Sequence, residues 1–119
     1  MSRVYVVQEP LKMSPTGVAV PRINYATLTP FGEVRFCFTW GEITDRTLLD
    51  DTASYLERAR LALATFGDGD YLVPLGHPGL IALCTLAAAE ANEGRIALLD
   101  WSRVNRAYRV VQIDLDASA

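Results

Sequence analysis

The sequence predicts an α/β fold, bordering on the α+β class, in which a mixed sheet of four to five strands carries two helices. Short runs rich in β-branched and aromatic residues recur along the chain, as they do in strands. Two longer segments repeat apolar residues at helical spacing. A strand, a helix and a second strand follow one another over residues 71–101, which is typical of a crossover between parallel strands. The length of 119 residues indicates a single domain, 1–119.

The amino-terminal part of the chain is expected to supply one strand followed by turns. Val4–Gln8 is short, β-branched and aromatic, which indicates a strand buried on at least one face. Lys12–Pro21 contains prolines and a glycine and is expected to be a loop or an irregular arm. Disorder is expected only there and at Asp116–Ala119. Ile23–Leu28 is a candidate edge strand, and Thr29–Gly32 is a predicted turn with proline in its second position.

The next strand, Glu33–Trp40, alternates between two faces. Its large apolar side chains point one way, namely Val34, Phe36, Phe38 and Trp40. The other face carries Arg35, Cys37 and Thr39. Four large side chains on one face predict a half-buried strand that covers a helix, and Gly41 is expected to end it.

The first helix is predicted over Leu48–Phe66, because apolar residues there share one face. That face consists of Leu48, Thr52, Tyr55, Leu56, Ala59, Leu63 and Phe66. Thr47 is placed to cap the helix, with Asp50 in its first turn. The charged side chains of Glu57, Arg58 and Arg60 are expected to face water. Gly67 is the expected left-handed terminator.

The rest of the chain predicts a strand, a helix and a C-terminal hairpin. Tyr71–Leu75 is the strand, and Pro78–Asn92 is a helix with proline at its first position. That helix is apolar almost all round, so it is expected to lie between the sheet and the first helix or to form a homo-oligomer contact. The hairpin consists of two predicted strands, Arg95–Trp101 and Tyr108–Leu115, joined by Ser102–Ala107. The first of them is expected to be parallel to Tyr71–Leu75.

Composition and spacing exclude several classes of function. A net charge of −3 argues against a dedicated nucleic-acid binder, because neutralising phosphates needs a surplus of Lys and Arg. The longest apolar stretch, Leu80–Ala89, is too short to span a bilayer, and Met1-Ser2-Arg3 leads straight into a strand. We therefore expect no membrane or secretory segment and a cytoplasmic location. Cys37 and Cys84 are expected to be reduced, partly buried thiols, and no spacing indicates a metal, a cofactor or a catalytic group.

The turn before the second helix is a weak candidate site for a small ligand. It joins the carboxyl end of a strand to a helix N-terminus, where free backbone N–H groups attract anions, and its candidate residues are Gly76, His77 and Gly79. The turn lacks the Gly-Lys-Ser/Thr ending of a phosphate loop, and Pro78 removes one donor. The alternative interpretation is a helix cap, in which His77, the only histidine, has no chemical role. Asp68-Gly69-Asp70 is interpreted as a turn, since a calcium loop needs more oxygen ligands.

The C-terminal hairpin is the most suggestive surface for binding a partner. Its candidate residues are Arg95, Trp101, Arg103, Arg106, Tyr108 and Arg109. Arginine beside exposed aromatic residues stacks on bases or binds phosphates. The same residue types are the preferred anchors of protein–protein interfaces. A third interpretation is a solvated hairpin with cross-strand pairs from arginine to Asp100 and Asp114.

Short segments along nearly the whole chain are similar to a known group of proteins. They are Val6-Val7-Gln8-Glu9-Pro10, Phe31-Gly32-Glu33, Tyr71-Leu72-Val73-Pro74-Leu75-Gly76-His77-Pro78, Gly94-Arg95 and Ile113-Asp114-Leu115. The chain resembles small uncharacterised proteins encoded by tailed phages and prophages of alphaproteobacteria. The resemblance implies a phage origin and action in the host cytoplasm, but no activity and no functional residue. Members of that group more often have Asp at the position of His77, so the resemblance assigns His77 no shared role.

The leading hypothesis from the sequence is a non-enzymatic phage accessory protein that binds a host or phage protein. Small phage proteins of this kind include inhibitors of host defence and of transcription. The alternative is binding of single-stranded nucleic acid through the hairpin. A weaker alternative is binding of a small anionic ligand at Gly76–Gly79.

Overall fold

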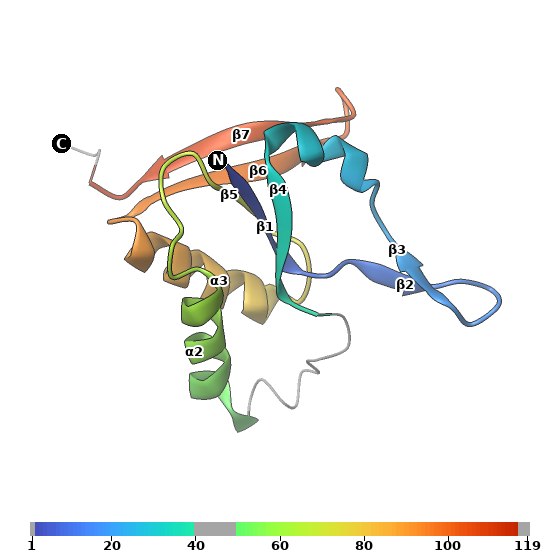
Figure 1. The fold of residues 1–119 in the computed structure, drawn as a ribbon, viewed down its shortest axis with the longest axis horizontal. Coiled ribbons are helices and arrows are strands. Elements are labelled where there is room, and N and C mark those ends of the chain that lie inside the picture. The colour runs from blue at the N-terminus through green and yellow to red at the C-terminus, as the bar shows by residue number, and fades with distance from the viewer. Residues whose placement is uncertain (1, 40–49, 117–119) are drawn as a thin grey trace.

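The computed structural model describes residues 2–39 and 50–116, which form a mixed five-stranded sheet with helices packed on it (Figure 1). The strands, in sheet order, are β4 (Glu33–Phe38), β1 (Arg3–Gln8), β5 (Tyr71–Val73), β6 (Arg95–Ser102) and β7 (Ala107–Asp114). The strands β4, β1, β5 and β6 are parallel to one another, and β7 is antiparallel to β6. The predicted α/β class, the parallel crossover and the C-terminal hairpin are confirmed.

Strand β1 is an interior strand, paired with β4 and β5, and it is buried on both faces. Val4 and Val6 join one apolar cluster, and Tyr5 and Val7 join the other. All four side chains are buried, as the continuous apolar run of a central parallel strand requires. The core therefore consists of two layers, one on each side of β1.

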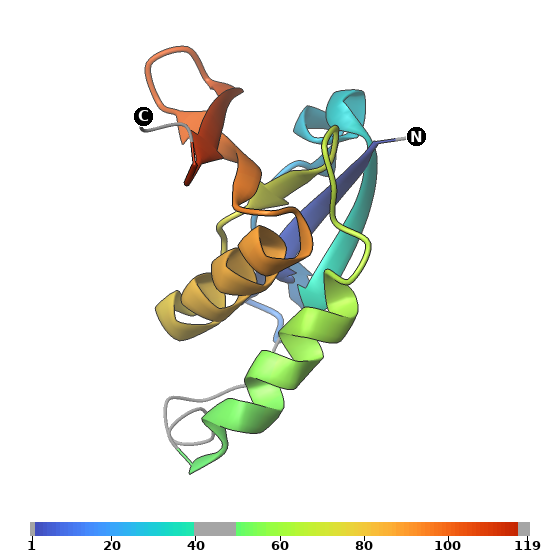
Figure 2. The ribbon, with the colours of Figure 1, turned by 90° about the vertical axis from the view of Figure 1, so that its left-hand side faces the viewer.

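Helices α2 (Thr52–Ala62) and α3 (Pro78–Ala91) lie side by side against one face of the sheet (Figure 2). Their buried residues pack with Tyr5, Val7 and Leu72 of the sheet. In α3 the buried residues are Leu80, Cys84, Ala87 and Ala88. The sheet and α2 together cover this face of α3, so its burial needs no second subunit. None of the described helices is long and apolar enough to cross a membrane.

The opposite face of the sheet is covered by two short 3-10 helices, η1 (Tyr25–Thr27) and η2 (Thr29–Phe31). The predicted edge strand over Ile23–Leu28 is therefore wrong. The side chain of Asn24 accepts a hydrogen bond from the Ala26 N–H (3.0 Å), which starts a helical turn instead. The predicted turn over Thr29–Gly32 is confirmed by a hydrogen bond from the Gly32 N–H to the Thr29 carbonyl (3.3 Å).

The arm predicted over Lys12–Pro21 is a separate two-stranded antiparallel hairpin, β2 (Leu11–Met13) and β3 (Ala19–Pro21), which lies apart from the main sheet (Figure 1). The expectation of an irregular arm is wrong because Ser14 closes the turn. Its N–H donates to the Val18 carbonyl (2.8 Å), and its hydroxyl accepts from the Val18 N–H (3.1 Å).

Strand β4 departs from the prediction in what its apolar residues cover. Phe38 packs with the helices, and its ring centroid lies 5.9 Å from that of Tyr55. Val34 instead joins the cluster under η1 and η2, and Phe36 makes an edge contact with Tyr25. The expectation that this whole face covers a helix is therefore wrong, because η1 and η2 occupy that side of the sheet. Trp40 and Gly41 lie outside the described residues.

Helix α2 is shorter than predicted. It begins at Thr52, capped by Asp51, whose carboxylate accepts from the Ser54 N–H (3.4 Å), and it ends at Ala62. Thr47 and Leu48, the predicted cap and first residue, lie outside the described part of the chain. The predicted place of Asp50 in the same first turn therefore stays a prediction. The prediction that Gly67 is left-handed is wrong. Gly69, in the turn that follows, has that conformation instead, with φ of 92°.

One charged residue of α2 is also placed differently from the prediction. The guanidinium of Arg58, expected in water, lies 5.0 Å from the ring centroid of Phe38 and 5.4 Å from that of Tyr55. This arrangement is a cation–π contact.

The remaining boundaries differ from the predictions by one or two residues. Strand β5 ends at Val73 rather than Leu75, because the Leu75 N–H turns back to the Val73 carbonyl (2.9 Å). Strand β6 extends to Ser102, β7 begins at Ala107, and the hairpin loop is reduced to residues 103–106. Helix α3 begins at Pro78 as predicted.

Candidate functional site

The C-terminal hairpin is a regular antiparallel ribbon at one edge of the sheet. Its register runs from the pair Arg95 and Asp114 to the pair Ser102 and Ala107. The Asn105 N–H donates to the Ser102 hydroxyl (3.2 Å) and closes the loop. Strand β7 is the last strand of the sheet, so only one of its sides is paired with another strand.

Trp101 and Tyr108 face each other across this ribbon. They are register partners, and their ring centroids lie 5.0 Å apart at 69°, an edge-to-face contact. Tyr108 packs against the second core cluster, and burial raises the pKa of its hydroxyl. The Trp101 side chain remains 42% exposed. The pair thus presents an exposed indole on a half-buried tyrosine that packs against the core.

Two of the four candidate arginines are ion-paired. Arg109 binds its cross-strand neighbour Asp100 (2.9 Å), as the solvated-hairpin interpretation predicts. Arg95 lies opposite Asp114 in the register, but its guanidinium binds Asp68 (3.2 Å) instead. The predicted pair with Asp114 is therefore wrong, because the turn before β5 brings a second carboxylate to Arg95. Hydrogen bonds from Asn92 and Arg95 lower the pKa of Asp68.

Arg103 and Arg106 lie in the exposed loop of the hairpin. Neither makes an ion pair within residues 2–39 and 50–116. Arg106 has φ of 50°, the left-handed conformation that reverses the chain here. Val104, between them, is 93% exposed. The tip therefore carries two unneutralised positive charges beside an exposed aliphatic side chain.

Apolar exposure continues along β7, a feature that was not expected from the sequence. Its centre, Val110 and Val111, is exposed on both faces, and Leu115 is exposed just beyond it. Two adjacent valines in a strand point to opposite faces. No element that could cover both faces follows β7 in the described part of the chain. The two adjacent valines in the last strand were therefore the sequence signal that could have revealed this exposed surface.

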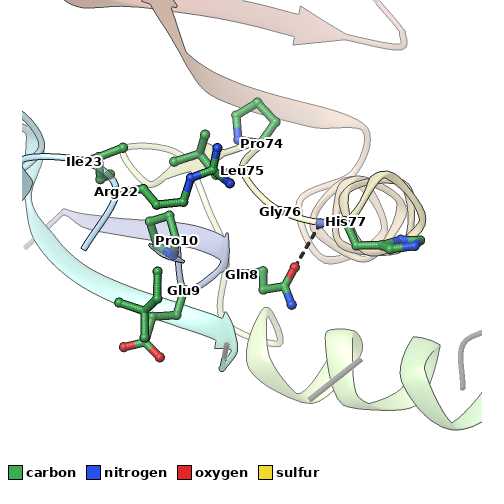
Figure 3. Close-up of a pocket in the computed structure, with 10 residues that line it drawn as sticks. Gln8, Glu9, Pro10, Arg22, Ile23, Pro74, Leu75, Gly76 and His77 are labelled. Atoms are coloured by element: carbon green, nitrogen blue, oxygen red, sulfur yellow. Dashed lines mark hydrogen bonds between the residues drawn. The ribbon is translucent and has the colours of Figure 1, made fainter. Parts of the chain in front are cut away.

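The turn at Gly76–Gly79 is a self-capped helix start. The His77 N–H donates to the side-chain oxygen of Gln8 (2.9 Å), as Figure 3 shows. The Gly79 N–H donates to the His77 Nδ1 (3.0 Å), and Pro78 has no N–H. Two of the donors expected to attract an anion are thus used within the protein. Anion binding at this turn stays a prediction, and it would have to use groups other than the His77 and Gly79 N–H donors.

An open pocket of about 670 Å³ lies beside this turn (Figure 3). One wall follows the end of β1 and comprises Gln8–Leu11, and the opposite wall follows the end of β5 and comprises Pro74–His77. Arg22 and Ile23 complete the lining. Of these residues only Gly76 and His77 were candidates from the sequence. The rest come from segments far apart in the chain, and their meeting depends on the order of the strands.

Cys37 and Cys84 also come from distant segments. Both are free thiols, and both belong to the cluster beneath the helices. A hydrogen bond with the Cys37 thiol, together with burial, raises the pKa of Cys84. Burial and the Cys37 thiol therefore both disfavour the thiolate of Cys84, which is the form that acts as a nucleophile.

A family model described as Phage Pam3 gp32-like protein matches residues 2–115 of the chain. The chain belongs to this phage protein family. Comparison with curated proteins finds no match, and neither does comparison with solved structures.

Membership of the Pam3 gp32-like family confirms the phage-encoded family that was expected from the sequence. The restriction to alphaproteobacteria stays a prediction, because the family description names a phage and no bacterial host. All nine candidate residues of the hairpin and the turn lie within the matched residues. Both candidate sites therefore belong to the part of the chain that is shared with the family.

Proposed function

We propose that this Pam3 gp32-like protein is a non-enzymatic phage accessory protein that binds a host or phage protein in the host cytoplasm. The proposed interface is the hairpin surface, which comprises Trp101, Arg103, Val104, Arg106, Val110 and Val111. The observation that carries the proposal is the exposure of apolar side chains along an edge strand, beside an anchored tryptophan.

The residues of the hairpin surface suit a protein partner. Tryptophan and arginine are the residue types that contribute most to binding energy at interfaces. The indole of Trp101 is held by Tyr108, so little side-chain freedom is lost when a partner covers it. The outer side of β7 also offers backbone donors and acceptors to an added strand.

The charge of the hairpin tip restricts the partner further. Arg103 and Arg106 are positive and exposed, whereas the chain as a whole carries a net charge of −3. A partner with acidic side chains around an apolar centre would complement both features.

Affinity capture with matched variants tests the proposal. Tagged wild-type protein, Trp101→Ala and Leu86→Ala are incubated with host lysate, before and after infection, at physiological salt. Leu86 is the control because it is an exposed apolar residue on α3 that is not part of the hairpin surface. We expect one partner that is recovered by wild type and Leu86→Ala and lost with Trp101→Ala. Recovery of no specific partner, or equal recovery by both variants, would end the proposal.

The two unpaired arginines at the tip, next to an exposed indole, favour single-stranded nucleic acid as the second candidate ligand. The support is weaker, because Arg95 and Arg109 are neutralised by carboxylates. This function predicts salt-sensitive binding that falls when Arg103 and Arg106 are both replaced by alanine. A gel-shift titration at low salt that remains flat for the wild type rules it out.

A further inference from the structure

The pocket beside β1 and β5 lies where the winding of the sheet reverses. The connection from β1 to β4 passes over the face that is covered by η1 and η2. The connection from β5 to β6 passes over the other face, through α3. At such a point the two connections leave neighbouring parallel strands in opposite directions, and a crevice opens at the carboxyl ends of the strands. The open pocket occupies this position.

Half of the residues that line the pocket are apolar, and one arginine side chain extends towards them. Pro10, Leu11, Ile23, Pro74 and Leu75 supply the apolar lining. Arg22 stands at the rim, where its backbone N–H donates to the Pro10 carbonyl (2.6 Å). Figure 3 shows its side chain extending towards Pro74 and Leu75.

The positive charge of Arg22 has no carboxylate partner among the residues that the structure describes. The acidic residue of the lining, Glu9, directs its carboxylate away from Arg22 (Figure 3). The backbone donors of the adjacent helix start are used by Gln8 and His77. A guanidinium binds a carboxylate through two parallel N–H donors, whereas the larger charge of a phosphate would need further donors, and the His77 and Gly79 N–H groups are already used.

We infer that the pocket binds a small organic carboxylate with an apolar body, which Arg22 holds by its carboxylate while the proline, leucine and isoleucine side chains cover the rest. A volume of about 670 Å³ is of the size that takes a small ligand. This inference is independent of the hairpin surface, because the two share no residue.

Titration with octanoate, followed by amide chemical shifts, tests the inference. We expect saturable shifts centred on Leu11, Ile23 and Gly76 in the wild-type protein. Arg22→Leu keeps most of the aliphatic stem and removes the charge, and it should weaken binding about tenfold or more. Arg22→Lys should restore part of the affinity. Arg106→Leu, which removes an exposed arginine from the hairpin loop, should bind as the wild type does.

Two ligand controls separate this site from non-specific apolar binding. Octylammonium has the same chain with the opposite charge and should bind at least about tenfold more weakly than octanoate. Equal affinity for the two ligands, equal affinity of wild type and Arg22→Leu, or scattered shifts without saturation would each overturn the inference. If Arg22→Leu does not fold, the comparison of the two ligands on wild-type protein decides alone.

The same variants keep the two proposals apart. Arg22→Leu should still recover the protein partner in the capture experiment, and Trp101→Ala should still bind octanoate. Loss of octanoate binding in Trp101→Ala would place the ligand on the hairpin and overturn the pocket inference.

Discussion

Gly76 has a conformation and an environment that no other residue fits. Its φ is 120°, outside the range that L-amino acids with a side chain readily adopt. A Cβ on this residue would also lie 2.5 Å from the Cβ of Gln8. The side chain of Gln8 is in turn held by the His77 N–H. The glycine thus allows the hydrogen bond that connects the end of β1 to the start of α3.

Gly76→Ala is expected to lower the free energy of unfolding by about 2–4 kcal/mol, from backbone strain and the clash with Gln8 together. Gly17→Ala is the matched control, because Gly17 is also left-handed, with φ of 83°, but has open space where a Cβ would lie. It should lose only about 1 kcal/mol. Urea unfolding of the two variants measures the difference, and equal losses would show that the contact with Gln8 is unimportant.

Tyr25 has a buried polar group without a partner in the part of the chain that the structure describes. Its hydroxyl is buried and has no hydrogen-bond partner among the described residues. Burial, followed by the charge of Glu9, raises the pKa of this hydroxyl. The folded state therefore keeps the proton at a pH where an unfolded tyrosine, with a pKa of about 10, has begun to lose it. The resulting stability is fully present below pH 10 and is lost as the pH rises further.

Tyr25→Phe is expected to reduce this alkaline loss of stability. The free energy of unfolding, measured by denaturant titration from about pH 8 to pH 11, should fall less steeply in the variant than in the wild type. Part of the fall should remain, because burial also raises the pKa of Tyr108. Identical slopes for variant and wild type would contradict the assignment to Tyr25.

Helix α3 has one buried face and one exposed face, although apolar residues occur on both. Leu80 is fully buried, whereas Leu86, less than two turns later, is 62% exposed. Leu80→Ala should destabilise the protein by about 2–5 kcal/mol because it leaves a cavity. Leu86→Ala should change stability by less than about 0.5 kcal/mol. Thermal or urea unfolding compares the two, and a large loss for Leu86→Ala would indicate that another chain covers this residue.

The elements differ in how far the sequence could predict them. Helix α3 was predictable because Pro78 marks its first turn and its apolar run is long. Strands β2 and β3 were not, because three-residue strands have no detectable periodicity and their pairing depends on Ser14. The turn η1 depends on one side-chain hydrogen bond of Asn24, which a propensity argument does not reveal.

The two candidate sites differ in the same respect. Half of the hairpin surface, namely Trp101, Arg103 and Arg106, was predicted, because these residues are close together in the sequence and local pairing determines their arrangement. Its three valines were not, and the exposure of the two in β7 depends on that strand being an edge strand. The pocket was not, because its walls follow two strands that are separated by more than sixty residues in the chain. Only the strand order, with β1 next to β5, brings Arg22 and Leu75 to one cavity.

For the whole molecule, the position of each strand predicts how fast its backbone amides exchange with solvent. Strand β1 is paired on both sides and buried on both faces, so its amides should exchange only through global unfolding. The hairpin β2–β3 belongs to a separate sheet and should open locally and exchange much faster.

Native-state hydrogen exchange followed by NMR checks this order. Leu80→Ala should speed the exchange of β1 in proportion to the global loss of stability and leave β2–β3 unchanged. Equal protection of β1 and β2–β3 in the wild-type protein would contradict it.

The interior position of β1 also affects synthesis on the ribosome. The strand precedes both of its neighbours in the chain, and its partner β5 is complete only at Val73. Strand β4 can pair with one edge of β1 once Phe38 has been made, but the other edge stays open until more than half of the residues of the nascent chain have been added. Such segments are the ones that misassociate during folding. Translation speed and chaperone supply should therefore affect the yield of this protein more strongly than its small size suggests.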